Sequence, residues 1–377
     1  MHYFIIAGEA SGDLHGAHLI QALRRHDPDA VITFLGGDKM AEASGEQPVI
    51  HYRDMAFMGF SEVLRNIGKI GRNLSKAREA LRMAKPDCLI LIDYPSFNLK
   101  VAATAAKENI PVYYYISPKI WAWKKWRLAT IKKRVKKVLC ILPFEPTFYK
   151  ANKTPIATYV GNPSVEEVDA AMLSVLPREE FLKKHKLRDR PLIALMPGSR
   201  LGEIRNNLAV MRLAADTFPQ YRPVIIAAPG IDDEVYNKWG GIRLPILRDD
   251  AVQVLAHCRA ALVTSGTATL ETALCGIPQV VCYRANGAKI SYDIMEKILD
   301  IEFVSLPNLI AGKKIVPEML VHNCTPSLVA DQLGPLLRQD SPERLAQTEG
   351  YTLMREILGR HNAADNAASI IVGDLRS

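Results

Sequence analysis

Three turns of small and polar residues follow apolar segments of strand length, and they are the first candidates for chemistry. Their sequences are GEASGD at residues 8–13, PGSRLGE at residues 197–203 and TSGTATLE at residues 264–271. After a parallel strand, the next helix presents free N–H groups and the positive end of its dipole. Small residues let an anionic ligand approach this backbone closely. The three turns therefore predict ligand binding at the carboxyl ends of strands.

The two turns in the second half of the chain have side chains that suit a nucleotide. PGSRLGE contributes Ser199 and Arg200, and an arginine can hold a phosphate group through two hydrogen bonds. The third turn has small or hydroxylated residues at its start, namely Ser265, Gly266 and Thr267. One helical turn later, Glu271 could accept both hydroxyls of a ribose, although ordinary helix capping gives a similar pattern. Together these residues indicate nucleotide binding in the second half.

The first half offers an acid at the end of the apolar segment DCLILID. Asp93 stands where a general base would be placed in a parallel sheet, and a helix N-cap is the alternative interpretation. GEASGD differs from the GxGxxG fingerprint of dinucleotide-binding proteins, so Gly8 and Gly12 could also be residues of a tight turn.

We expect no metal and no cofactor. His15 and His18 lack a third ligand or an HExxH pattern, and we interpret them as solvent-facing helix residues. The DxD sequence at Asp27 and Asp29 precedes a strand instead of following one, which favours a turn.

Two basic regions suggest anionic partners. In residues 60–85, apolar and basic side chains fall on opposite helical faces, which is typical either of a helix packed on a sheet or of one lying on anionic lipid. Residues 119–137 mix nine basic residues with three tryptophans and could contact phospholipid head groups or nucleic acid. The predicted membrane-contact residues are Phe57, Met58, Phe60, Arg65, Lys69 and Arg72.

The elements that would position these residues alternate between apolar strands and helical patterns from end to end. Near-continuous apolar strands are typical of parallel sheets with both faces covered, so each half is predicted to be a doubly wound α/β domain. A chain of 377 residues also exceeds the usual size of a single core. We place the domains at residues 1–163 and 164–345, with residues 346–377 as helices that return to the first domain.

Composition limits the class of protein. The net charge of +8 favours an anionic partner without identifying it. The N-terminus lacks the pattern of a signal peptide, and no apolar stretch has the length of a membrane-spanning helix. The six cysteines are scattered without CxxC spacing, which fits a reducing cytoplasm.

In its motifs and their order, the chain resembles the lipid-A-disaccharide synthase family over nearly its whole length. The matching segments, in chain order, are GEASGD, MGFSEVL, IDYPSFN, ISPKIWAWKKWR, LPFE, LMPGSRLGE, TSGTATLE and SLPNLIAG. The resemblance implies a GT-B fold, with two Rossmann-like domains facing a cleft. It also implies an inverting transfer of 2,3-diacylglucosamine from its UDP ester to the 6-hydroxyl of 2,3-diacylglucosamine 1-phosphate. The family forms this β-1,6 lipid A disaccharide at the inner face of the inner membrane of Gram-negative bacteria.

The resemblance also implies roles for individual residues. Asp93 would deprotonate the acceptor hydroxyl, and Arg200 would stabilise the diphosphate without a metal. Ser11 and Asp13 would line the acceptor side. The implied UDP-binding residues are Ser199, Arg200, Ser265, Gly266, Thr267, Glu271 and Asn308. Two positions depart from the family pattern, because Ser96 replaces a second acid and Asn162 replaces a frequent histidine.

Two other functions stay open at this point. A UDP-sugar 2-epimerase would use the same architecture on a soluble sugar nucleotide. A basic nucleic-acid-binding protein would use the tryptophan-rich segment, but the turns after the strands would then have no purpose. We therefore expect as partners UDP-diacylglucosamine, the acyl-sugar phosphate and an anionic membrane surface, without nucleic acid. Acyl-chain length and oligomeric state, including a homodimer, are left open by the sequence.

Overall fold

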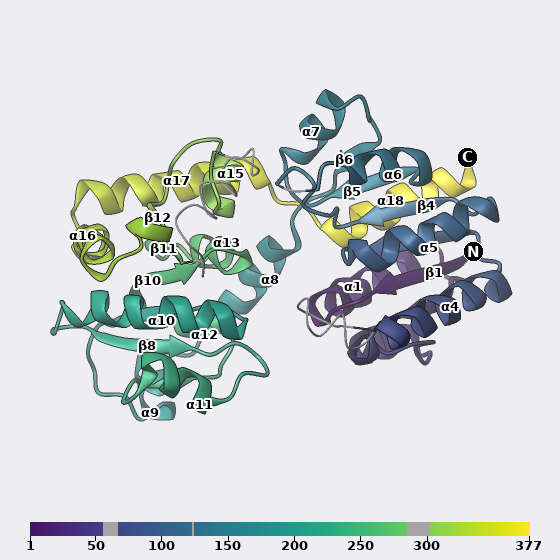
Figure 1. Cartoon of the computed structure of the whole chain (residues 1–377). Coiled ribbons are helices and arrows are strands. Elements are labelled where there is room, and N and C mark those ends of the chain that lie inside the picture. Colours follow the sequence, from purple (N-terminus) through teal and green to yellow (C-terminus); the bar gives the residue numbers. More distant parts are fainter. Residues whose placement is uncertain (56–66, 123, 285–301) are drawn as a thin grey trace. The chain divides into compact units, whose positions relative to one another are not determined.

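The computed structural model describes residues 1–55, 67–122, 124–284 and 302–377. These residues form two compact units (Figure 1). The first unit contains Met1–Pro163 and Arg360–Ser377, and the second contains Ser164–Gly359. Each unit has its own parallel sheet with helices on both faces.

The sheet of the first unit has six parallel strands in the order β2-β1-β3-β4-β5-β6. The strands are β1 (His2–Ala7), β2 (Val31–Leu35), β3 (Cys88–Ile92), β4 (Val112–Tyr115), β5 (Lys137–Cys140) and β6 (Ala157–Tyr159). The helices include α1 (Ala10–His26), α2 (Asp38–Ser44), α4 (Ile67–Ala84), α5 (Pro95–Lys107), α6 (Arg127–Arg134), α7 (Glu145–Ala151) and α18 (Ala363–Arg376).

Both faces of this sheet are buried, which explains why its strands are apolar almost throughout. On β1, Tyr3 and Ile5 belong to one core cluster with residues of α1 and α18. Phe4 and Ile6 point to the opposite face and pack with residues of α4 and α5. Alternate side chains of a strand point to opposite faces, so each face needs its own helical layer.

The sheet of the second unit also has six parallel strands, in the order β12-β11-β10-β7-β8-β9. The strands are β7 (Leu192–Met196), β8 (Arg222–Ile226), β9 (Ile246–Leu247), β10 (Cys258–Thr264), β11 (Gln279–Tyr283) and β12 (Glu318–Leu320). The helices include α8 (Pro163–Met172), α9 (Arg178–Lys184), α10 (Leu201–Asp216), α11 (Asp233–Tyr236), α12 (Ala251–Leu255), α13 (Thr267–Leu274), α15 (Leu306–Ala311), α16 (Pro326–Leu337) and α17 (Pro342–Leu358).

Each sheet has one point at which the direction of strand succession reverses. In the first unit this point lies between β1 and β3, and in the second it lies between β7 and β10. Ligands of open parallel sheets bind outside the carboxyl ends of the strands at such points. GEASGD follows β1, the Asp93 turn follows β3, PGSRLGE follows β7 and TSGTATLE follows β10. The four candidate turns therefore flank the two switch points.

The C-terminal segment joins the first unit later than the predicted residue 346. Helix α17 belongs to the second unit, because Tyr351 and Gln347 hydrogen-bond Gln279 at the start of β11. Helix α18 packs on the first unit, where Arg25 pairs with Asp365 at 2.9 Å. The returning segment accordingly starts at Arg360.

Among the described residues, no helix combines the length and apolarity that crossing a bilayer requires.

Candidate active site

The Asp93 turn has a backbone conformation that few residues adopt. Asp93 and Tyr94 have positive φ angles of 41° and 45°, in the left-handed region that costs energy for residues with a side chain. Two donors hold the Asp93 carbonyl in place, since Asn98 Nδ2 and the Tyr114 hydroxyl each donate to it over 2.7 Å. The turn is thus fixed by its surroundings, as is common where a side chain must be aimed precisely.

The GEASGD turn lies directly beside the Asp93 turn. Ala7 at the end of β1 is in register with Ile92 at the end of β3. A Cβ atom added to Gly8 would lie 2.2 Å from the Tyr94 ring, so the ring occupies the space that any other residue would need. The Tyr94 hydroxyl then donates to the carbonyl of Met55 over 2.7 Å. Glycine at residue 8 is therefore required by packing between the two turns.

The prediction placed Asp13 on the acceptor side, but its carboxylate is used in hydrogen bonds within the first unit. Its side chain is only 3% exposed, and its carboxylate accepts hydrogen bonds from the backbone N–H groups of Gly37, Lys39 and Met40 at 2.7–3.2 Å. A carboxylate is favourable there because it satisfies N–H groups at the start of α2. Ser11, in contrast, is exposed, and its acceptor-side role stays a prediction.

The carboxyl group of Asp93 stands in a crowded but solvent-accessible position. It is exposed, yet desolvation by the surrounding protein raises its pKa above the ordinary value. The positive charges of Lys119 and Arg127 oppose this shift. A base with a raised pKa binds a proton more firmly, which suits general base catalysis. Lys119 and Arg127 both belong to the basic, tryptophan-rich segment at residues 119–137.

The histidine pair on α1 differs from the prediction in one respect. His15 is half-buried, and desolvation lowers its pKa to about 4, so it is neutral at physiological pH. His18 shows the same direction of pKa shift, with burial as the main cause. Within the ranges that the structure describes, no three His, Cys, Asp or Glu side chains form a group that could hold a metal ion.

In the second unit, Glu203 shapes the PGSRLGE turn. Its carboxylate accepts hydrogen bonds from the N–H groups of Ser199 and Arg200 at 3.0 and 3.3 Å. A Cβ atom on Gly198 would lie 2.5 Å from the Glu203 side chain, so glycine is needed there. Arg200 is at the N-cap of α10, its side chain is 71% exposed, and its contact with Glu203 is only a 3.6 Å ion pair. The Arg200 guanidinium is thus available to an anionic ligand.

The TSGTATLE turn leaves room at its centre. Gly266 has a φ angle of 156°, and a Cβ atom there would meet no atom of the described residues within 4 Å. Thr267 at the start of α13 is exposed, whereas the Ser265 hydroxyl donates to the carbonyl of Val304 over 2.9 Å. A ligand can therefore approach the backbone at Gly266 and Thr267, and Ser265 can still act as an acceptor.

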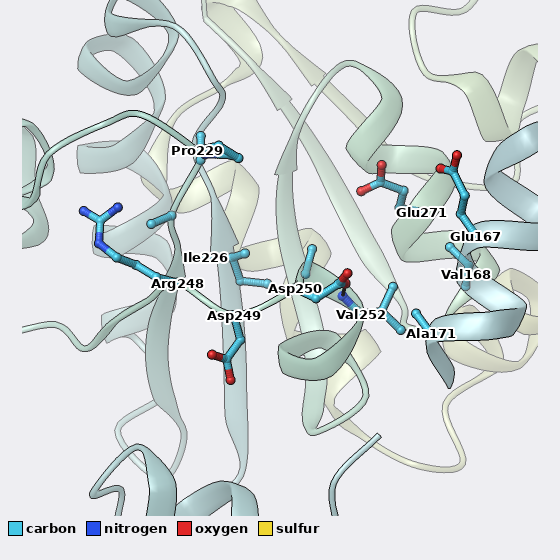
Figure 2. Close-up of a pocket in the computed structure, with 13 residues that line it drawn as sticks. Glu167, Val168, Ala171, Ile226, Pro229, Arg248, Asp249, Asp250, Val252 and Glu271 are labelled. Carbon is cyan, nitrogen blue, oxygen red and sulfur yellow. Dashed lines mark hydrogen bonds between the residues drawn. The ribbon is translucent and has the colours of Figure 1, made fainter. Parts of the chain in front are cut away.

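Glu271 lines a pocket of about 530 Å³ within the second unit (Figure 2). Figure 2 shows Glu167 of α8 and Glu271 of α13 at one end of this pocket and Arg248 at the other. Burial, and secondarily the charge of Asp250, raises the pKa of Glu271. No described residue forms an ion pair with its carboxylate. A carboxylate so placed can accept hydroxyl groups from a ligand in the pocket.

The rest of this pocket was missed by the sequence interpretation. Backbone and side chains after β8 and β9 form it, including Pro229, Arg248 and Asp250. Asp250 caps α12 by accepting a hydrogen bond from Val252 over 2.8 Å, and Asp249 binds Lys184 and His185. The sequence signal was the pair of acids that follows the segment GIRLPIL and precedes a helix.

Asn308 does not supply the predicted contact with UDP. It is fully buried, and its Nδ2 donates to the carbonyl of Val316 and to Glu318 at 3.0 and 2.9 Å. Its Oδ1 accepts from the N–H groups of Ile315 and Val316 at 2.7 and 2.9 Å. All the hydrogen-bonding capacity of the amide is used, so Asn308 holds the loop between α15 and β12.

Most of the predicted membrane-contact residues, namely Phe57, Met58, Phe60 and Arg65, lie outside the described residues. Arg72 is exposed, but Lys69 pairs with Asp54 at 2.9 Å. In the described part of α4, Ala77 and Leu81 belong to the core of the first unit. This part of the helix therefore has its apolar face on the protein, which was the alternative to a lipid contact.

With this geometry established, comparison with known proteins decides the family. The sequence model of the Lipid-A-disaccharide synthetase family matches residues 3–371. The chain belongs to the lipid-A-disaccharide synthase family. The lipid-A-disaccharide synthase of Myxococcus xanthus is 40% identical over 376 residues, which cover 98% of this chain and 96% of that protein. The lipid-A-disaccharide synthase of Syntrophus aciditrophicus is 37% identical, covering 97% of this chain and 95% of that protein.

Solved structures show that this lipid-A-disaccharide synthase family member has the GT-B fold. A UDP-GlcNAc 2-epimerase from Neisseria meningitidis bound to UDP-GlcNAc matches with a TM-score of 0.65 and 14% identity, covering 100% of both chains. MurG from Acinetobacter baumannii matches with a TM-score of 0.56 and 13% identity, covering 100% of this chain and 99% of that chain. At such low identity these structures support the fold alone. The epimerase alternative is therefore a likeness of architecture, whereas the sequence relatives are disaccharide synthases.

Proposed function

We propose that the chain transfers 2,3-diacylglucosamine from its UDP ester to the 6-hydroxyl of 2,3-diacylglucosamine 1-phosphate, with UDP as the second product. The observation that carries this proposal is the placement of the four motif turns at the two switch points of sheets in a member of this family. The second unit would bind the nucleotide through the start of α10 and α13, and the first unit would supply the base.

In this reaction Asp93 takes the proton of the acceptor 6-hydroxyl as its oxygen attacks the anomeric carbon of the donor. The new bond forms on the face opposite the leaving UDP, which keeps the electron pair of the broken bond, so the α donor gives a β linkage. Arg200 and the N–H groups that open α10 and α13 stabilise the departing diphosphate. Glu271 accepts the ribose hydroxyls. These donors make a metal ion unnecessary in the proposal.

A transfer assay tests the reaction. Purified protein is given UDP-diacylglucosamine and the acyl-sugar phosphate in the presence of EDTA, and UDP and disaccharide are measured. Arg200→Ala should reduce kcat by about 10²–10³, because an exposed donor to the leaving group is lost. Arg188→Ala, another exposed arginine of the second unit, is the matched control and should keep full activity. Turnover of UDP-N-acetylglucosamine without any acceptor would instead support an epimerase.

Because both proposed substrates carry acyl chains, the enzyme would bind them at a membrane surface, on its cytoplasmic side. Trp126 is 69% exposed, and Lys132 and Lys133 of the adjacent α6 are exposed as well. An aromatic ring beside lysines is suited to the interface of anionic lipids. Co-sedimentation with phosphatidylglycerol vesicles should decrease in Trp126→Ala and at high salt. The absence of pelleting at low salt would remove this part of the proposal.

A further inference from the structure

Arg127 is a buried cation without an ionic partner. It opens α6, its side chain is 6% exposed, and its Nη2 donates to the hydroxyl of Ser96 over 2.9 Å. No carboxylate of the described residues lies at ion-pair distance from its guanidinium. Burial lowers the pKa of Arg127, the charge of Asp93 compensates this shift in part, and the Trp126 ring centroid lies 5.6 Å from the guanidinium. A bound anion in direct contact would stabilise this buried cation further.

Other positive groups gather around the same place. Lys124 has a lowered pKa, which results from desolvation and then from the charge of Arg127. Lys119 and Arg127 both act on Asp93, whose own pKa is raised by desolvation. Asp93 is thus one acid among several cations. Lys119 and Arg127 place two positive charges beside the one carboxylate of Asp93.

The start of α5 adds to this potential. Ser96, the partner of Arg127, lies in the first turn of this 13-residue helix. The N-cap residue Tyr94 makes no side-chain capping bond. The first turn therefore retains the partial positive charge of a helix N-terminus, directly beside the guanidinium. A phosphate group would satisfy both the helix turn and the arginine.

The acceptor carries such a group at a suitable place. In a pyranose ring, C1 and C5 both flank the ring oxygen, so a 1-phosphate and the 6-hydroxyl lie on the same edge of the sugar. A base that contacts the 6-hydroxyl must therefore have the phosphate about one ring away. Asp93 and Arg127 come from neighbouring elements, because the Ser96 that binds Arg127 is three residues after Asp93.

We propose that Arg127, together with Lys119 and the first turn of α5, binds the phosphate of the acceptor while Asp93 contacts its 6-hydroxyl. This inference rests on the proposed function and names the group by which the enzyme selects its acceptor. It also assigns a role to the tryptophan-rich basic segment.

The test compares two acceptors that differ only in the phosphate. Rates are measured with 2,3-diacylglucosamine 1-phosphate and with the neutral methyl glycoside of 2,3-diacylglucosamine, for the wild type, Arg127→Gln and Lys119→Gln. Lys119 is exposed, so its replacement does not threaten folding. Arg134→Gln is the matched control, since Arg134 is on the same helix and donates to the carbonyl of Leu99 over 3.1 Å.

Arg127→Gln should raise KM for the phosphorylated acceptor by about 10- to 100-fold, which corresponds to one lost charged hydrogen bond. KM for the UDP-sugar should stay within twofold. The neutral acceptor should lose much less activity than the phosphorylated one, because Arg127 then acts only through its charge near Asp93. Lys119→Gln should show a smaller effect in the same direction. An equal loss with both acceptors would mean that Arg127 only holds the fold, and the inference would fall. A parallel loss of binding to phosphatidylglycerol vesicles would assign the site to lipid head groups and also overturn it. If the wild type makes no disaccharide from either acceptor, the proposed function itself fails.

Discussion

The ring of Tyr94 stands where a Cβ atom of residue 8 would be, with only 2.2 Å between the two positions. This close approach joins the turn after β1 to the turn after β3, on which Asp93 is placed. The Tyr94 hydroxyl donates to the carbonyl of Met55 over 2.7 Å, so the ring is held in this position. Gly8, which has no side chain to take part in the chemistry, thereby controls the direction of the Asp93 side chain.

Gly8→Ala should therefore inactivate the enzyme more than it unfolds it. The added methyl displaces the Tyr94 ring and with it the Asp93 turn, and we expect kcat to decrease by at least about 10²-fold, as small misplacements of reacting groups do. Steady-state transfer kinetics and urea unfolding measure the two effects. Gly71→Ala is the control, because no atom of the residues that the structure describes lies within 4 Å of a Cβ there, and alanine should stabilise α4 by about 0.5–1 kcal/mol. Unchanged kcat in Gly8→Ala would contradict the packing argument.

The pH dependence of the reaction follows from the raised pKa of Asp93. A base acts only when ionised, so activity is lost as pH falls through this pKa, and the acid limb should lie above the ordinary aspartate value of 3.8. Asp93→Asn should abolish this limb and reduce kcat by about 10²–10⁴, without weakening UDP binding. A variant that keeps full activity with an unchanged pH profile would show that another group is the base.

Glu271→Gln tests the ribose contact. An amide presents one acceptor oxygen where the carboxylate presents two, so we expect the Kd of UDP to rise about tenfold. Because burial raises the pKa of Glu271, UDP affinity of the wild type should also decrease as the solution is acidified. Isothermal titration of UDP measures both effects. Glu167→Gln, at the same end of the pocket, is the comparison, and an equal effect in both variants would make the pocket charge rather than Glu271 responsible.

Asn308→Ala should destabilise the second unit and leave nucleotide affinity intact. The N–H groups of Ile315 and Val316 would lose their acceptor, at a cost of about 1–3 kcal/mol for each buried group. Urea unfolding should show the loss, whereas Asn323→Ala, at an exposed asparagine, should not. A large increase in the Kd of UDP with normal stability would restore the predicted ligand contact.

Glu145 should make the stability of the first unit pH-dependent. This residue is 1% exposed, accepts hydrogen bonds from Trp121 and from the N–H of Leu142, and has its pKa raised to about 8, mainly by burial. Between the unfolded value of 4.5 and about 8, the folded protein holds a proton that the unfolded chain releases. Stability therefore decreases as pH rises through this window, by at most about 1.4 kcal/mol per pH unit from this group.

Urea unfolding at about pH 5.5, 7 and 8.5 compares the stability of the wild type with that of Glu145→Gln. The variant cannot ionise, so the wild type should lose stability relative to it as pH rises. A difference that is constant across the three conditions would show that Glu145 is ionised throughout.

The fold was largely predictable because its strands are buried on both faces. Apolar runs such as HYFIIAG and DCLILID mark β1 and β3 directly. Strand β12, of three residues, has no matching apolar run in the sequence, as is expected of so short an edge strand. The end of the second unit was also placed too early, because the contacts of Tyr351 with β11 are invisible in a helical pattern.

The sequence by itself determined the α/β class, the first domain boundary and the turns that matter, because strand burial and turn chemistry are local. It could not decide which polar side chains are free. Asp13 and Asn308 resemble ligand contacts in the sequence, but the backbone N–H groups that occupy them come from other elements. Tertiary structure alone also brought Arg127 to Ser96 and Tyr94 to Gly8. Arg127 and Ser96 are 31 positions apart, and strands β2 and β3 with their helices lie between Gly8 and Tyr94, so no local pattern could reveal either contact.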